Sequence, residues 1–174
     1  MGFTFNDVVA SLNSLQPYDW RAFLSTRLEG HGPGAPLAGI TRAGWKLVYG
    51  ETPSDFFKDV EAYRKVSDFY YSIGVTLDSS GRIAEVLWNS PAFKAGLSRG
   101  FTVIAVNGKA YKPELLRGAI SAAKVDRQPI EFLLRQADRY QTMRIDYHDG
   151  LKYPRLERID GTPDRLEAIF RPRP

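Results

Sequence analysis

Side chains that commonly perform catalysis are few in this chain, and none lies in a spacing that completes a catalytic motif. The two histidines, His31 and His148, do not form the His-Glu-x-x-His helix that holds a zinc ion between imidazoles one turn apart. Cysteine is absent, which excludes thiol nucleophiles and thiolate metal sites. No serine lies in a Gly-x-Ser-x-Gly turn. Asp146 and Asp149 could pair as carboxylates, but acids at the end of a strand are usually solvated. We therefore expect no catalytic or metal site.

Composition narrows the classes of partner. Hydrophobic residues make up 43% and charged residues 25% of the 174 positions, which is typical of a soluble globular protein. The net charge is +4, but lysine and arginine alternate with acids, and the one cationic cluster is the end of the chain at residues 171–174. No apolar run approaches the ~20 residues that cross a bilayer. We expect neither nucleic acid nor a membrane as a partner.

The first third of the chain is expected to be mainly helical. Thr4 and Asp7 fit a capping box at the start of one helix, and Pro17 fits the first turn of a second helix that ends near Gly30. A loop rich in glycine and proline follows at residues 31–36, then a strand at 45–49 and a helix from about 52 to 64. Its aromatic residues Trp20, Phe23 and Trp45 need a surface to pack against, either a larger body or the small domain that follows them in the chain.

From Phe69 onward, short strands separated by turns replace the helical pattern. Ser90 and Pro91 open a short helix, and Pro113 opens a longer one that runs to about Ala123. Strands are expected at residues 73–77, 83–88, 101–106, 130–135 and 141–147. The fold class is therefore α+β, and a short tail helix with Thr162 as its cap is expected near the end.

Three stretches in this order resemble the bacterial PDZ domains of HtrA-type proteases. They are Ile73-Gly74-Val75, Ser90-Pro91-Ala92-x-x-Ala95-Gly96-Leu97 and Val106-Asn107-Gly108. The resemblance covers residues 66–148 and implies a small, partly open β-barrel or sandwich with two helices. Two positions depart from the pattern: Ser72 stands where an aromatic residue is usual, and Phe101 stands where aspartate is usual.

The resemblance also implies a peptide site. Backbone amides of the loop before Gly74 would hold a terminal carboxylate, and the peptide would add as a strand beside residues 75–77, with the helix from Pro113 as the other wall. We call the space between that strand and that helix the predicted peptide groove. Two of its helical residues have core packing as the alternative, namely Leu116 and Ile120. The predicted peptide-binding residues are Tyr71, Ser72, Ile73, Gly74, Val75, Thr76, Leu77, Lys112, Leu116 and Ile120.

The flanking segments resemble the C-terminal part of the glycyl aminopeptidases, gluzincin-type zinc metallopeptidases that carry a PDZ domain after a helical catalytic region. The stretches that carry this resemblance are residues 16–24, 43–45 and 161–166. That family binds zinc through a His-Glu-x-x-His helix and a downstream glutamate, which this chain lacks. The resemblance therefore implies no cofactor on this chain, with zinc in a catalytic domain that lies outside it.

These inferences predict three parts and one leading function. Residues 1–65 would be the helical end of a peptidase catalytic region, 66–148 a PDZ domain, and 149–174 a tail whose Leu166, Ile169 and Phe170 pack back onto the body.

The leading function is non-catalytic binding of extended peptides or protein C-termini, which guides substrate or regulates access in a parent hydrolase of bacterial type. The alternative is a structural domain packed on the catalytic body, with its groove blocked or filled by its own chain. A stand-alone enzyme is disfavoured. The resemblance favours an exported or periplasmic location and leaves the cytoplasm open.

Overall fold

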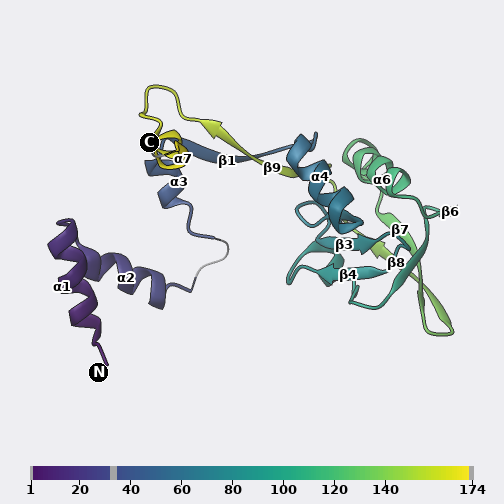
Figure 1. Ribbon diagram of the computed structural model, residues 1–174. Helices are drawn as coiled ribbons and strands as arrows, with labels where there is room; N and C mark the ends of the chain where they lie inside the picture. The colour runs from purple at the N-terminus through teal and green to yellow at the C-terminus, as the bar shows by residue number, and fades with distance from the viewer. Residues whose placement is uncertain (1, 32–34, 173–174) are drawn as a thin grey trace. The chain divides into compact units, whose positions relative to one another are not determined.

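The computed structural model describes residues 2–31 and 35–172, and the chain divides into two compact units, residues 1–36 and 37–174 (Figure 1). The fold is a mixture of helices and antiparallel sheets, as the sequence predicted. Half of the predicted glycine- and proline-rich loop, residues 32–34, lies outside the described residues. The predicted division into three parts at residues 65 and 148 stays a prediction.

The first unit consists of α1 (Phe5–Leu15) and α2 (Trp20–Glu29). The predicted capping box is present in α1, where Thr4 N donates to Asp7 Oδ2 at 2.7 Å and Asp7 N donates to Thr4 Oγ1 at 3.3 Å. The prediction that Pro17 opens α2 is wrong. The helix begins later, because the carboxylate of Asp19 accepts a 2.9 Å hydrogen bond from Ala22 N and so caps it there.

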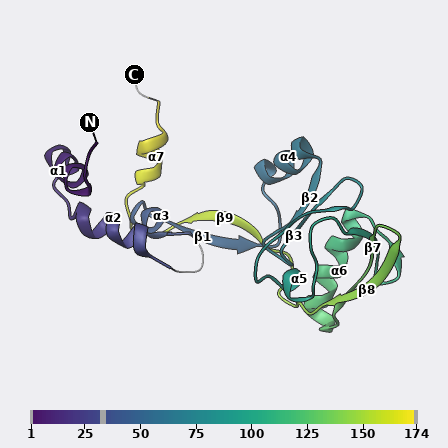
Figure 2. The same ribbon diagram turned by 90° about the horizontal axis from the view of Figure 1, so that it is seen from below.

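The second unit contains a two-stranded antiparallel ribbon. Strand β1 (Trp45–Gly50) pairs with β9 (Tyr153–Arg158), with Leu47 opposite Leu156, and both views show the two strands side by side (Figures 1 and 2). A short helix, α3 (Ala38–Arg42), precedes β1. The sequence predicted β1 but not β9, because a proline and three charged residues hide the strand pattern.

The tail ends in helix α7 (Arg165–Phe170), and two predictions about it are wrong. Its cap is Asp164 rather than Thr162, whose hydroxyl donates to the Ile159 carbonyl at 2.6 Å instead. Ile169 and Phe170 do not pack back, since they are 70% and 78% exposed. The tail is held by polar contacts, because Asp164 Oδ1 accepts a 3.0 Å hydrogen bond from Trp45 Nε1.

The remaining elements build what we call the β-rich core, which consists of strands β2 to β8 with helices α5 and α6. One sheet has the order β2-β3-β4, and the other has the order β6-β5-β7-β8. Helix α4 (Asp55–Arg64) precedes the core and is capped by Ser54. The bounds are β2 Val66–Phe69, β3 Val75–Asp78, β4 Ile83–Val86, α5 Pro91–Lys94, β5 Thr102–Val106, β6 Lys109–Ala110, α6 Pro113–Asp126, β7 Ile130–Gln136 and β8 Arg139–Ile145.

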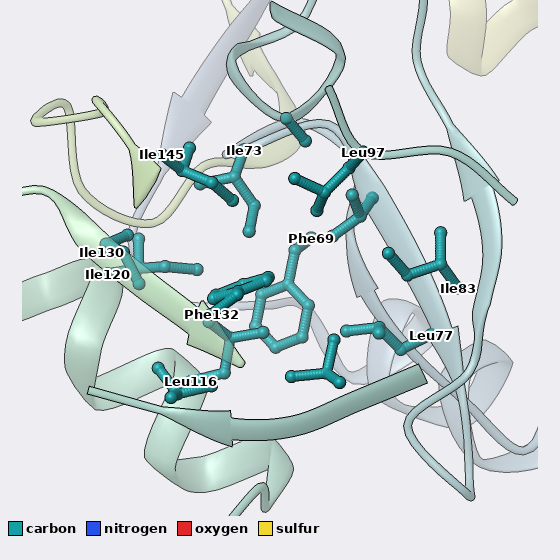
Figure 3. Packing of buried hydrophobic residues seen from close by; sticks show 14 of the residues in the cluster. Phe69, Ile73, Leu77, Ile83, Leu97, Leu116, Ile120, Ile130, Phe132 and Ile145 are labelled. Carbon is teal, nitrogen blue, oxygen red and sulfur yellow. The ribbon is translucent and has the colours of Figure 1, made fainter. Parts of the chain in front are cut away.

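The two sheets and α6 enclose one hydrophobic cluster. Alternate residues of β3 and β7 point inward, and the buried face of α6 carries Leu116 and Ile120. Figure 3 shows Phe69 of β2 among these side chains, with Phe132 of β7 in the same cluster. This strand-end phenylalanine is 1% exposed. The cluster is therefore closed partly by a residue that lies just ahead of the predicted site.

Candidate functional site

The predicted carboxylate-binding loop connects β2 to β3 and is anchored on the segment around α5. Ala92 N donates to the Ile73 carbonyl and Leu87 N to the Gly74 carbonyl, both at 2.9 Å. Gly74 has φ +87°, and a Cβ atom there would lie 2.1 Å from Ser90 Cβ. Only glycine fits this position without displacing the cap of α5. The predicted role of Gly74 in binding a peptide carboxylate stays a prediction, and its close neighbour in the structure is Ser90.

The amides of this loop already have an acceptor. Ser72 N and Gly74 N donate to the carbonyl oxygen of Phe69 at 3.1 Å and 3.0 Å. The resemblance assigned such amides to the carboxylate of a peptide, and here a carbonyl of the chain itself takes that place. The hydroxyl of Ser72 accepts a 3.0 Å hydrogen bond from Lys152 N, so this buried side chain helps to fix the segment after β8.

Strand β3, the predicted receiver of a peptide strand, is paired on both edges. β4 lies along one edge and β2 along the other, in antiparallel register with Phe69 opposite Val75 and Ser67 opposite Leu77. Strand β2 also reaches α6, because the guanidinium carbon of Arg117 lies 5.5 Å from the centre of the Phe69 ring. Residues 66–69 therefore occupy the predicted peptide groove, running antiparallel to β3 with Phe69 beside the loop.

The structure brings only part of the predicted site together. The buried members are Ser72, Ile73, Gly74, Val75, Leu77, Leu116 and Ile120, and the apolar side chains among them belong to the hydrophobic cluster. Core packing, the alternative for Leu116 and Ile120, describes where these two residues lie. The other predicted members do not join them. Thr76 points to the opposite face of the sheet, and Lys112 is exposed just before α6. The ring of Tyr71 is tilted by 47° against that of Tyr49, with the ring centres 5.7 Å apart.

A single carboxylate connects the three elements around β2. Glu61 of α4 accepts a 2.6 Å hydrogen bond from Asp68 N of β2 and two 3.1 Å hydrogen bonds from Arg117 Nη2 of α6. The Glu61 side chain is 12% exposed and that of Arg117 is 29% exposed, so water screens this pair only in part. Sequence reasoning missed Glu61, Phe69 and Arg117. Phe69, a large apolar residue just ahead of Ile-Gly-Val, was the one signal available.

A cavity of about 380 Å³ lies between α4 and the outer face of the sheet. Of the predicted site residues, Tyr71 and Thr76 line it, together with Glu61, Asp68 and Glu85. Burial raises the pKa of Asp68 above its usual value, and the neighbouring Glu61 and Glu85 carboxylates raise it further, while the Tyr70 amide opposes the change. The cavity therefore lies beside the Glu61–Asp68 hydrogen bond that joins α4 to β2.

The ring nitrogens of His148 are not free to bind a zinc ion. Both ring nitrogens of His148 are engaged, Nδ1 with the Ala123 carbonyl at 3.0 Å and Nε2 with Asp146 Oδ1 at 2.6 Å. Across residues 2–31 and 35–172, no three His, Cys, Asp or Glu side chains converge as metal ligands. Over the same residues, no helix combines the length and the apolar character that a membrane span requires.

Comparison with known proteins places the fold. No family model and no curated protein matches the chain. Among solved structures, an aminopeptidase N family protein from Idiomarina loihiensis is similar over 98% of this chain, with 18% identity and a TM-score of 0.58. The chain shares its fold with part of that protein. It spans 29% of that protein's length, so most of the aminopeptidase has no counterpart here.

A second solved structure is the HtrA3 PDZ domain bound to a phage-derived ligand, FGRWV. It covers 66% of this chain and 91% of its own, at 17% identity and a TM-score of 0.31. A score this low carries no argument about the fold of this chain.

Proposed function

We propose that this chain is a non-catalytic, C-terminal portion of a zinc aminopeptidase, and that its β-rich core is a PDZ-type domain whose peptide groove is filled by its own strand β2. Its role is structural: it packs against the catalytic body and contributes an interaction surface rather than an open peptide site. The fold shared with part of an aminopeptidase N family protein, over nearly the whole chain, supports the parent class.

The observation that carries the closed groove is the pairing of β2 with β3. Each feature that would hold a peptide, namely the β3 edge, the loop amides and the apolar space beside Leu116, is used by residues 66–69. A free peptide loses translational and rotational entropy when it binds. Strand β2 is part of the same chain, so its docking does not carry this loss. We therefore expect β2, rather than a soluble peptide, to occupy the groove at micromolar peptide concentrations.

The test is a titration of the isotope-labelled chain with a pool of short peptides that bear free C-terminal carboxylates. The expected result is no saturable change in the amide signals of Ile73, Gly74 and Val75. Saturable shifts at these three positions at micromolar peptide would show an open groove, and guidance of substrate peptides would replace the structural role.

The non-catalytic part of the proposal has its own assay. Glycyl and alanyl substrates are incubated with the chain, with and without added zinc and with a chelator. No turnover is expected, because no three His, Cys, Asp or Glu side chains converge as metal ligands among the described residues and His148 is engaged at both nitrogens. Turnover that the chelator abolishes would overturn it.

A further inference from the structure

The strand in the groove has the properties of a bound ligand. It is four residues long, Val66-Ser67-Asp68-Phe69, and alternate side chains are buried, so that Ser67 and Phe69 face inward. The carbonyl of its last residue, Phe69, accepts hydrogen bonds from Ser72 N and Gly74 N, the loop amides that the resemblance assigned to a peptide carboxylate. The segment that precedes it turns sharply at Lys65, which has φ +53° and is the single residue between α4 and β2.

The contacts that retain this strand are unevenly divided. On the inner side, Phe69 is fully buried against the cluster. On the outer side, α4 contributes no buried residue, and its Phe56 and Tyr63 are 77% and 90% exposed. A cavity of about 380 Å³ lies between part of α4 and the sheet. The polar contact that ties α4, β2 and α6 together is the Glu61 carboxylate with its three hydrogen bonds.

Resting on the function proposed above, we propose that β2 is an exchangeable internal ligand, latched by Glu61, whose place is taken by an extended chain terminus ending in a phenylalanine-like residue when the latch opens. The aromatic preference follows from the space that Phe69 fills. That space is lined by aliphatic side chains and by the Phe132 ring, with the Arg117 guanidinium 5.5 Å from the Phe69 ring centre. An incoming phenylalanine restores the apolar burial that Phe69 gives up, and its carboxylate meets the same two amides with a full negative charge.

The latch is tested by binding measurements on the full chain. The probe is acetyl-Val-Ser-Asp-Phe with a free carboxylate, and its controls are the C-terminal amide and the peptide ending in alanine. Glu61→Gln removes the charge from the latch while keeping its shape, and Glu131→Gln is the matched control, because Glu131 forms a similar two-bond pair with Arg144 at the surface.

We expect Glu61→Gln to bind the free-carboxylate probe about tenfold more tightly than wild type does, because loss of a charged hydrogen-bond acceptor raises the open population by about that factor. Glu131→Gln should bind as wild type does, and the two control peptides should bind more weakly than the probe. Equal affinity of wild type and Glu61→Gln for the probe would overturn the latch.

The preference for a terminal phenylalanine is tested by asking whether the probe restores the stability of a variant that lacks the Phe69 ring. Phe69→Ala empties the space that this ring fills, and the probe should raise the melting temperature of this variant by several degrees while leaving wild type unchanged. Phe132→Ala removes another fully buried ring of the same cluster from outside β2 and should show no such rescue. No rescue of Phe69→Ala, or equal rescue of both variants, would overturn the exchange of β2 for a chain terminus.

The two proposals fail in different ways. If wild type itself binds the probe at micromolar concentration, the groove is open and the structural role falls. If wild type does not bind and neither variant gains binding or stability, the closed groove stands and β2 is a permanent part of the sheet.

Discussion

The two units of this chain bury their apolar residues very differently. In the β-rich core, side chains from both sheets and α6 meet in one cluster, and many of them are completely inaccessible to water. In the first unit, α1 is clearly amphipathic and α2 only weakly so, and neither helix has a buried residue. The β-rich core therefore buries its apolar side chains within itself, whereas the apolar side chains of the two helices stay partly or fully accessible to water.

The difference predicts a large contrast in protease sensitivity. Trypsin should cut the intact chain at Arg21 and Arg27 of α2 at least about a hundredfold faster than at Arg117 or Arg135 of the β-rich core, because helices without a packed face open at little cost. Mass spectrometry of a time course locates the cuts. First cuts inside the core would show that the two units differ less than their burial indicates.

Within the core, Phe69→Ala should cost about 3–5 kcal/mol of unfolding free energy, because it empties a fully buried ring site. The matched change in the first unit, Phe23→Ala, removes a half-buried ring and should leave the urea midpoint of the core unchanged. Urea unfolding followed by core methyl signals measures both. A small loss for Phe69→Ala would mean that β2 contributes little to the core.

Alanine substitutions at two glycines, one in the loop before β3 and one on α6, should change the stability of the core in opposite directions. Gly74→Ala should destabilise the core by about 2–4 kcal/mol, since it adds left-handed backbone strain to a clash with Ser90. Gly118→Ala lies on the exposed face of α6 with open space around its Cβ and should stabilise the core by about 0.5–1 kcal/mol. Opposite signs are expected in thermal unfolding, and a neutral Gly74→Ala would refute the close approach.

The smallest effect concerns Asp68 and depends on pH. Its pKa is raised in the folded protein, so the charged form destabilises the fold, and this penalty grows as pH rises from the unfolded value of 3.8 through the folded pKa. Asp68→Asn keeps the acceptor for Tyr70 N and should be about 0.5 kcal/mol more stable than wild type at pH 7. The two proteins should converge at pH 3. A constant difference across this range would show that the carboxylate charge is not the cause.

Local signals explain what the sequence predicted well. The capping box of Thr4 and Asp7, the Ser90-Pro91 start of α5 and most strands of the core depend on residues within a few positions of one another. Strand β2 was missed because four residues containing serine and aspartate carry no strand pattern of their own. The pairing of Glu61 with Arg117 joins residues far apart in the sequence, and no local rule predicts it. Only part of the predicted peptide site comes together for the same reason. The burial of Leu116 and Ile120 was predictable from local pattern, but which strand lies beside them was not.

Hydrogen exchange of the Ser72 and Gly74 amides in the peptide-free, full-length chain tests the central claim most directly. Both amides donate to the Phe69 carbonyl, so the closed groove predicts that they exchange as slowly as the amides of β7. Exchange at the rate of an open loop, with β7 still protected, would mean that β2 does not occupy the groove and would contradict the account.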